Sequence, residues 1–427
     1  MPTHISVRCA ARAIVAAALV MSAGCDLNIA NPNAATELGV LRSAAGIRAI
    51  GIGLQGRLGN MLEEGIYVPA LLSGELGNTN ATTSTTREFQ HFPQTTANSL
   101  IEETNGDVLD LWSKNYQIVK SANDIIGNID RVTIPGTRAG LLALAKLSKA
   151  IAFGTLIEAF EKIPIATTGA NPPFVDRAAA LTEALSLLAS AKTDATGTPL
   201  STDFTGSVLA PGFDLLNTIR AMQARYSLAA GNYADALAFA NEVPAGVSSV
   251  IPFASGDRNP LTELFFGSSF FGALSTFRAN AEAGDTRVAK FTTSATPVGF
   301  GGATLNGLNI YRAESDPIPL FTQDEMTLIR AEALARLDRL AEAIIQINIV
   351  RNANGLPSKT ALQLATKQAV LDEIFRQRTY SLFISGLHLS DLRRFGLLAL
   401  AKVAYLPYPF AERATNPNTP ANPPQVP

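Results

Sequence analysis

The sequence predicts a mainly α-helical fold, built from antiparallel helix pairs and interrupted by long loop-rich insertions. The first observation is a helical hairpin over 215–240, where apolar residues recur every three or four positions and a small residue, Ala236, follows the turn at 230–233. The second is a similar hairpin over 324–351, with Ala343 on its second helix. Apolar residues at this spacing line one face of a helix and place it against a core.

These hairpins look like tetratricopeptide-type helix pairs, which bury their apolar faces only by stacking on neighbouring pairs. Further helices are expected over 37–64, from 107 onward, and over about 138–162, 178–193 and 367–384. Two stretches, 66–106 and 244–321, are rich in Gly, Ser, Thr, Asn or Phe and predict loop-rich insertions. The end of the chain, 405–427, is rich in Pro and Asn and is expected to be extended or disordered.

The N-terminus has the organisation of a bacterial lipoprotein signal. Arg8 and Arg12 precede an apolar stretch at 14–21, which is too short to cross about 30 Å of hydrocarbon as a helix. Small residues then lead to Cys25, the expected lipid-acceptor position. The alternative is an ordinary cleaved signal whose first mature residues happen to include a cysteine. We expect a signal peptide at 1–24, a tether at 25–36 and a single body at 37–427.

Composition narrows the classes of function. The formal net charge of −2 lacks the basic excess that nucleic-acid binding requires, so we expect no nucleic-acid partner. The chain has three histidines and none of the common short motifs of metalloproteases, serine hydrolases or P-loop proteins. Cys9 would leave with the signal, so the mature chain could form no internal disulfide. We expect no enzyme activity, no cofactor and no metal site.

Two sequence patterns suggest a dinucleotide-binding or a catalytic site, but each has a simpler structural explanation. Residues 51–56 match the glycine pattern of dinucleotide-binding folds, yet no β-rich run precedes them, and close helix packing or local flexibility explains them better. The pairs Glu63-Glu64 and Glu102-Glu103 could suggest the two carboxylates of a glycoside hydrolase. Adjacent residues on a helix point in different directions, so we expect these glutamates to be solvated surface charges.

The two insertions supply the side chains that a binding site for a sugar or a peptide needs. Flat apolar faces together with convergent hydrogen-bonding groups recognise such ligands. The alternative for each phenylalanine is that it packs a loop onto the helices. The candidate ligand-binding residues are Glu75, Asn78, Arg87, Phe89, Phe271, Asn309 and Tyr311.

The C-terminal block 374–395 resembles the signature of the SusD/RagB family, a pattern close to I..ER..EL..EG.R..DLRR. The segments 112–123, 161–164, 330–333 and 348–357 resemble further motifs of that family, in the same order along the chain. In the C-terminal block the matching residues are Arg378, Leu382, Gly386, Asp391, Leu392 and Arg394, and the departing residues are Gln377, Ser381, Ser385 and His388.

The resemblance implies an α-rich body of tetratricopeptide-like helix pairs, whose loop-rich insertions carry the ligand site. It implies a lipid-anchored protein of the outer membrane that captures a nutrient, often a glycan or other oligosaccharide, for a TonB-dependent SusC-like transporter. We expect Arg378 and Asp391 to hold a helix to the tail rather than to touch ligand. The alternative is a tethered helical scaffold that binds a protein partner in envelope assembly.

Overall fold

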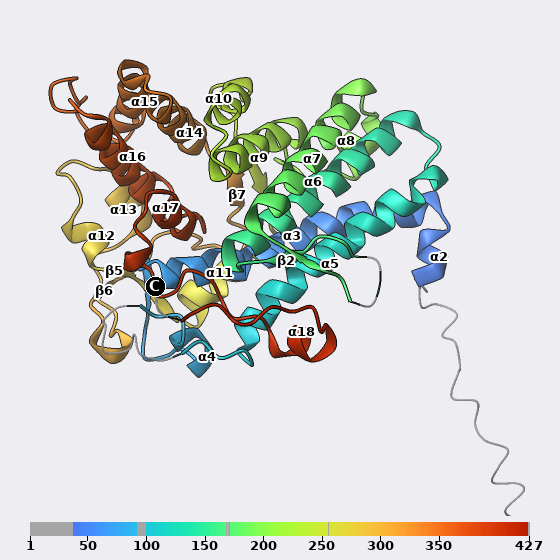
Figure 1. Cartoon of the computed structure of the whole chain (residues 1–427), viewed down its shortest axis with the longest axis horizontal. Helices are drawn as coiled ribbons and strands as arrows, with labels where there is room; N and C mark the ends of the chain where they lie inside the picture. Colours follow the sequence, from blue (N-terminus) through green and yellow to red (C-terminus); the bar gives the residue numbers. More distant parts are fainter. Residues whose placement is uncertain (1–36, 92–99, 168, 170, 255, 426–427) are drawn as a thin grey trace, which may run out of the picture. The chain divides into compact units, whose positions relative to one another are not determined.

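The computed structural model describes residues 37–91, 100–167, 169, 171–254 and 256–425 (Figure 1). The expected signal peptide, the tether and Cys25 lie outside these residues, so their assignment stays a prediction. The chain divides into two units, Met1–Val40 and Leu41–Pro427. Of the first unit the structure describes only part of the short helix α2 (Glu37–Leu41). All that follows concerns the second unit, which we call the body.

The body is a series of helices, each packed on the next. Helix α3 (Ala44–Leu72) packs on α5, α5 on α6, α6 on α7 and α7 on α9; α9, α10, α14, α15 and α16 then continue the series. This arrangement confirms the predicted fold class of mainly α structure with tetratricopeptide-like helix pairs. The bounds are α5 (Gly106–Asn128), α6 (Pro135–Ala159), α7 (Arg177–Gly197), α9 (Leu215–Ala229), α10 (Tyr233–Glu242), α14 (Gln323–Arg336), α15 (Leu340–Ala353) and α16 (Lys367–Ser381).

The two predicted hairpins are present, and small residues allow their helices to approach. Ala236 on α10 and Ala343 on α15 are fully buried. The α9–α10 turn passes through Gly231 at φ +80° and the α14–α15 turn through Asp338 at φ +62°, the left-handed backbone that ends many helices. The Asp214 carboxylate caps α9 by accepting the backbone N–H of Asn217.

Helix α6 is the core helix of the body. Within the described part of the chain it alone is long and apolar enough to cross a membrane, but most of it is buried against other helices. Two of its glycines admit aromatic rings, because a Cβ at Gly140 would lie 2.3 Å from Phe204 and one at Gly154 would lie 2.2 Å from Tyr226. These features are those of a closely packed core helix.

The segment predicted as the first insertion, 66–106, is shorter than expected. Helix α3 continues through Pro69 to Leu72, because the fixed φ of proline is helical and its missing N–H costs the helix only one hydrogen bond, to the carbonyl of Gly65. The prediction of irregular structure was therefore wrong for 66–72. After α3 come strand β1 (Leu76–Asn78) and helix α4 (Ser84–Arg87); residues 92–99 are outside the described part.

The second insertion contains mostly short elements. Strand β4 (Ser249–Ile251) pairs antiparallel with β7 (Ile318–Phe321) and closes the insertion near its ends. Between them lie α11 (Pro260–Thr262), the π-helical turn Glu263–Gly267, β5 (Phe271–Leu274), α12 (Thr276–Ala279), α13 (Arg287–Phe291), a 3₁₀ turn at Phe300–Gly302 and β6 (Leu305–Asn306). The remaining short elements are β2 (Ile163–Pro164), β3 (Phe174–Val175), α8 (Thr202–Ser207) and 3₁₀ turns at Ile129–Arg131 and Leu398–Leu400.

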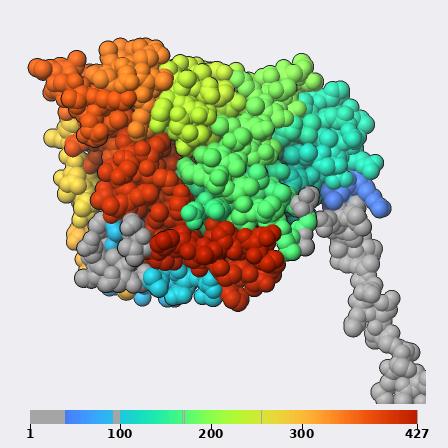
Figure 2. All heavy atoms as spheres, viewed as in Figure 1, coloured from blue at the N-terminus to red at the C-terminus, as the bar shows by residue number. Residues whose placement is uncertain are grey.

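The C-terminal segment lies on the surface of the body, in dark red in Figure 2. It contains α17 (His388–Arg394) and α18 (Phe410–Thr415), and neither helix was predicted. The Tyr408 ring stacks on Phe160, with ring centroids 6.1 Å apart, and its hydroxyl accepts the backbone N–H of Lys162. Arg413 pairs with Glu103 at 3.1 Å. Apart from α18, the tail through 425 consists of turns, bends and backbone without regular secondary structure.

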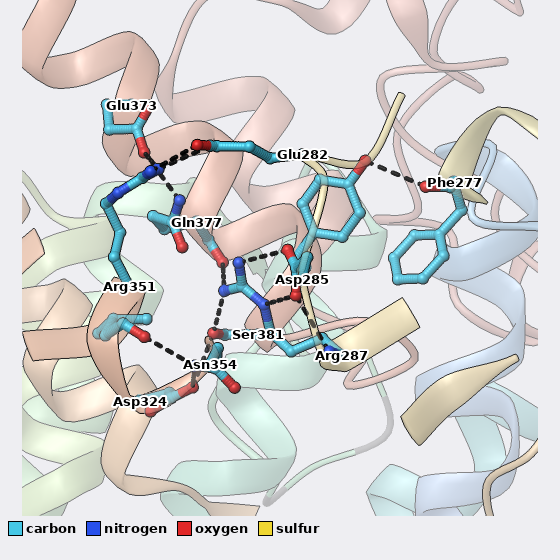
Figure 3. A network of polar contacts seen from close by, with 12 residues as sticks. Phe277, Glu282, Asp285, Arg287, Asp324, Arg351, Asn354, Glu373, Gln377 and Ser381 are labelled. Atoms are coloured by element: carbon cyan, nitrogen blue, oxygen red, sulfur yellow. Dashed lines mark hydrogen bonds and ion pairs between the residues drawn. The ribbon is translucent and has the colours of Figure 1, made fainter. Parts of the chain in front are cut away.

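A buried cluster of ion pairs fixes the second insertion to the C-terminal helices, and we call it the clasp (Figure 3). Arg351 of α15 is fully buried and pairs with Glu282 at 2.7 Å and with Glu373 of α16 at 2.6 Å. Arg287 pairs with Asp285 at 2.7 Å and also donates to the Ser381 hydroxyl. Because paired charges tolerate burial only with their partners, the clasp fixes the position of the insertion relative to α15 and α16.

Candidate functional site

The two insertions, far apart in sequence, form one structural unit. Strands β1, β5 and β6 make an antiparallel sheet in that order, with Asn78 opposite Phe271 and Leu274 opposite Leu305. An isolated bridge between Thr79 and Gly299 extends the contact. The pairing therefore brings together the two loop regions in which the sequence placed its candidate ligand-binding residues.

Four of those seven residues lie in the interior of this unit. Phe89 and Asn78 are fully buried, and Glu75 and Phe271 are at most 5% exposed. Phe271 stacks on Tyr67 of α3, with ring centroids 5.4 Å apart. The Asn78 side-chain amide donates to the carbonyl of Thr86. In this structure these four side chains hold the unit together, and their role in ligand binding stays a prediction.

Glu75 is a buried acid at the start of the sheet. Its Oε1 accepts the backbone N–H of Ile384, 3.2 Å away, in the turn between α16 and α17. Its Oε2 has no hydrogen-bond partner among the described residues. Burial raises the pKa of Glu75 from its ordinary value of 4.5 to about 8, although the Ile384 N–H opposes the shift. The side chain is therefore mostly a neutral carboxylic acid at pH 7.

Arg87, the fifth predicted residue, lies at the surface and stacks on an aromatic ring. Its guanidinium lies 4.2 Å from the centroid of the Phe300 ring and donates to the carbonyl of Asn80. A second stack of this kind places Arg312 4.9 Å from the centroid of the Phe266 ring. Both rings are partly exposed.

The backbone at Thr79–Asn80, which accepts a hydrogen bond from Arg87, also joins the first insertion to the second. The N–H of Asn80 donates to the carbonyl of Val298, and the N–H of Thr79 donates to that of Phe270. Val298 is 71% exposed. We call this surface the insertion face, and it comprises Arg87, Phe266, Phe270, Val298, Phe300 and Arg312.

The insertion face offers flat aromatic surfaces beside guanidinium donors. A sugar ring packs its apolar face on an aromatic ring while its hydroxyls accept hydrogen bonds from neighbouring donors. Sequence reasoning missed five of these six residues. The doublets Phe265-Phe266 and Phe270-Phe271 carried a usable signal, because in each doublet one ring is buried and the other is partly exposed.

The other two predicted residues, Asn309 and Tyr311, line a cavity of about 460 Å³ in the body. Helices α3, α6, α9 and α14 contribute to its walls, together with residues 309–322 and the α16–α17 turn. Its exposed lining residues, Lys290, Pro317 and Pro319, mark the opening. The volume lies within the range of small-molecule sites, about 300–1,000 Å³.

Arginine–carboxylate pairs lie along one side of the cavity. Arg225 binds both oxygens of Glu325, at 2.6 and 2.7 Å, and Arg378 pairs with Asp391 at 2.8 Å. Arg394 bridges Asp391 and Glu332, at 2.8 Å each. The pair Arg378–Asp391 joins α16 to α17, as expected for residues that hold a helix to the tail.

The electrostatics of these groups follow from their pairing. Burial opposes ionisation of Asp391, but Arg378 and Arg394 outweigh it and hold the pKa of its carboxyl below the ordinary value. Burial also lowers the pKa of Arg225, but Glu325 and, less strongly, Tyr226 and Asp391 raise it above the ordinary value. Asp391 therefore favours the charged form of Arg225 on α9 and also forms an ion pair with Arg378 on α16.

The glutamate pair at 63–64 departs from the prediction of solvated surface charges. Glu64 is only 4% exposed, and the Lys114 ammonium binds it at 2.6 Å and Glu63 at 3.1 Å. Burial, helped by the neighbouring charge of Glu63, raises the pKa of Glu64 to about 7. The helix α5 packs on α3 and covers this carboxylate, so the expectation was wrong for Glu64.

The glycine pattern at 51–56 lies in the middle of α3, without a strand before it. A Cβ at Gly51 would lie 2.5 Å from Leu141 of α6, which confirms close helix packing as the explanation of that glycine. Among the described residues no group of three His, Cys, Asp or Glu side chains could hold a metal ion.

Comparison with known proteins supports one family. The model of the SusD family matches residues 304–425. A search of the curated proteins finds no match. Among solved structures, a SusD superfamily protein of Bacteroides vulgatus has a TM-score of 0.72 at 15% identity, covering 89% of this chain and 99% of that chain.

Two further solved structures are similar to this chain along most of its length. A SusD-like carbohydrate binding protein of Bacteroides vulgatus has a TM-score of 0.65 at 18% identity, covering 82% of this chain and 83% of that chain. NanU of B. fragilis has a TM-score of 0.70 at 12% identity, covering 93% of this chain and 100% of that chain. Residues 304–425 therefore match the model of the SusD family, and the body as a whole has the fold of the solved SusD superfamily proteins.

Proposed function

We propose that this protein is a non-catalytic outer-membrane lipoprotein that captures an oligosaccharide at the insertion face. The bound nutrient is then passed to a TonB-dependent SusC-like transporter. The SusD-family segment, the SusD superfamily fold and the solved carbohydrate binding relative support the ligand class. The lipoprotein signal ending at Cys25 supports the anchor in the outer membrane.

One observation carries the proposal. The two insertions pair through β1 and β5 and together carry two arginine–aromatic stacks whose rings are partly exposed. A ligand held by ring stacking and a few hydrogen bonds on such an open face binds weakly. We expect dissociation constants of about 10 μM to 1 mM, which correspond to about 4–7 kcal/mol.

Titration calorimetry with a panel of neutral oligosaccharides tests this proposal. Phe300→Ala removes one ring of the face, and we expect it to weaken binding of the best oligosaccharide at least fivefold, about 1 kcal/mol. The matched control is Phe239→Ala, because Phe239 on α10 stacks with Lys192 at 5.5 Å, away from the insertion face. Equal loss in both variants, or no binding by any oligosaccharide, would contradict the proposed site.

The same incubations test the absence of catalysis. After prolonged contact with purified protein, each oligosaccharide should be recovered intact by mass spectrometry. Cleavage that is lost on Glu63→Gln or Glu64→Gln would instead identify an enzyme, since a glycosidase needs a carboxylate pair.

The transporter is tested separately, by native pull-down from solubilised outer membranes with mass identification. A large TonB-dependent barrel in equal amount is the expected partner. Recovery of the protein alone, or with assembly factors, would contradict delivery to a transporter. It would have no bearing on the proposal that the protein binds an oligosaccharide.

A second candidate function has one observation in its favour. Ile345 and Ile349, four residues apart on α15, are 58% and 50% exposed on the same helix face. Exposed apolar patches mark contacts with other proteins when they are large, and this pair would be the centre of such a patch. A tethered scaffold would recover envelope assembly proteins in the pull-down, and Ile345→Lys would remove them.

A further inference from the structure

The cavity of about 460 Å³ differs in chemistry from the insertion face. Its walls are mainly aliphatic, with Met61, Ile66 and Leu111 from α3 and α5 and with Met222, Leu320 and Ile329 from the opposite elements. Apolar walls favour an apolar ligand because its burial removes hydrocarbon surface from water, at about 25 cal/mol per Å². A polyhydroxylated ring would leave hydroxyls without partners on these walls.

The carboxylates along the cavity already have their partners. Glu325 accepts two hydrogen bonds from Arg225, and Asp391 accepts from both Arg378 and Arg394. Glu158 is held by Arg177 at 2.5 Å and by Arg393 at 2.6 Å. These carboxylates are therefore poor acceptors for a ligand's donor groups.

The arginines, in contrast, have donor capacity left. Arg378 is 3% exposed, and its Nη1 has no acceptor among the described residues, although the side chain lines the cavity. Arg225 uses its Nη1 only for a 3.4 Å contact with the thioether sulfur of Met222, a weak acceptor. A guanidinium with unused donors in an interior favours a ligand that brings an anionic acceptor, and a carboxylate fits its fork geometry.

The wall of the cavity also contains strained backbone. Ile384, in the α16–α17 turn, has φ +56°, and Tyr311 has φ +57°. Left-handed backbone costs a β-branched or bulky residue free energy, and such strain is concentrated at ligand sites. Both residues line this one cavity, which is an observation independent of the arginines.

We propose that the cavity is a second ligand site, which takes a small amphipathic molecule with one carboxylate. The carboxylate binds the free donors of Arg378 and Arg225, and the hydrocarbon part lies against the aliphatic walls. The opening at Lys290 adds a positive charge on the entry path. This site is distinct from the oligosaccharide face, so either proposal can fail without the other.

Three probes of equal chain length test the assignment: n-octanoate, n-octanol and n-octylammonium. Binding is measured by titration calorimetry at pH 7 on the mature chain carrying Cys25→Ser, which avoids a detergent that would compete for the cavity. We expect octanoate to bind at least tenfold more tightly than octanol, and octylammonium not to bind. If octanoate binds no more tightly than octanol or octylammonium, the assignment of a carboxylate ligand is wrong. If none of the three probes binds at millimolar concentration, the cavity is not a ligand site.

Two variants locate the binding. Arg378→Lys keeps a positive charge beside Asp391 but loses the fork donor Nη1, and we expect octanoate binding to weaken about tenfold. Ile310→Trp enlarges a partly buried lining residue beside Asn309 and should abolish binding. The matched control is Arg351→Lys, a buried arginine of the clasp outside the cavity, and octanoate affinity should be unchanged there.

These variants also separate this site from the insertion face. Oligosaccharide affinity should be the same in Ile310→Trp as in the unsubstituted protein. If octanoate affinity survives both Arg378→Lys and Ile310→Trp, octanoate binds elsewhere and the proposal is wrong. Should Arg378→Lys fail to fold, Ile310→Trp and the three-probe comparison still decide the question.

Discussion

Glu75 and Asp391 are both buried carboxyl groups, and their surroundings give them opposite protonation. Asp391 lies between two guanidinium groups, which hold its pKa below the ordinary value. Glu75 has one backbone N–H and no cation, so burial dominates and raises its pKa to about 8. At the residue scale, the pairing of each buried charge therefore decides how the protein responds to pH.

Glu75 should make the protein less stable as pH rises. It keeps its proton in the folded state up to about pH 8, but in the unfolded chain it ionises near the ordinary 4.5. Unfolding therefore releases a proton between these values, and the free energy of unfolding falls by up to about 1.4 kcal/mol per pH unit. Glu75→Gln cannot ionise and keeps an acceptor for Ile384, so its stability should fall less steeply in urea titrations from pH 5 to 8.

The control for this experiment is Glu314→Gln, at a side chain that is 51% exposed. It should leave the slope of stability against pH as it is in the unsubstituted protein. Parallel slopes for Glu75→Gln and the unsubstituted protein would show that Glu75 is ionised in the folded state.

Asp391→Asn should be strongly destabilising. Removing the carboxylate leaves Arg378 and Arg394 as buried cations with one partner fewer, and losses of about 3–5 kcal/mol are typical of a broken buried pair. Urea unfolding at pH 7 measures the effect. The matched comparison is Glu342→Gln at the exposed pair Arg339–Glu342, which should leave the free energy of unfolding unchanged. An equally small effect of Asp391→Asn would show that the buried pairs of Asp391 do not stabilise the fold.

At the element scale, the turn between α16 and α17 is where the helical series, the insertion sheet and the cavity meet. Ile384 binds Glu75 at the start of β1, and Gly386 packs against α3. Gly386 has φ +76°, and a Cβ there would lie 2.3 Å from the carbonyl oxygen of Gly65. Only glycine meets both the backbone and the space requirement at this position.

Comparing Gly386→Ala with Gly396→Ala separates the cost of the close contact from the cost of the left-handed backbone. Both glycines have positive φ, but nothing lies within 4 Å of a Cβ at Gly396. Gly396→Ala should cost about 1 kcal/mol for backbone strain, and Gly386→Ala at least about 2 kcal/mol more, because α16 or α3 must move. Thermal and urea unfolding measure the difference, and equal costs would contradict the close contact.

The sequence predicted the elements whose signal is local. The apolar spacing placed α9, α10, α14 and α15 and the small residues at their crossings, because a helix buries one face at a fixed period. It could not predict that Leu76 pairs with Ala273, since strand pairing across two hundred residues leaves no local pattern. The sequence analysis named Asn78 and Phe271, which turn out to be opposite each other in the sheet. It did not name Phe300, because only the fold brings this ring to Arg87.

At the scale of the whole molecule, the helical series supports the unit formed by the two insertions. The clasp joins the second insertion to α15 and α16, and β1 joins the first insertion to the end of α3. A binding face built from two distant segments depends on both attachments. The helical packing is therefore a condition for ligand binding at the insertion face, although the ligand itself contacts only the insertions.

The most direct test of this account is hydrogen–deuterium exchange, with and without the oligosaccharide that binds best. The account predicts slower exchange on ligand binding in residues 76–90 and 264–312, and little change in α14 and α15. Protection concentrated along α14 and α15, with none in the two insertions, would contradict the insertion face as the ligand site and favour the scaffold function.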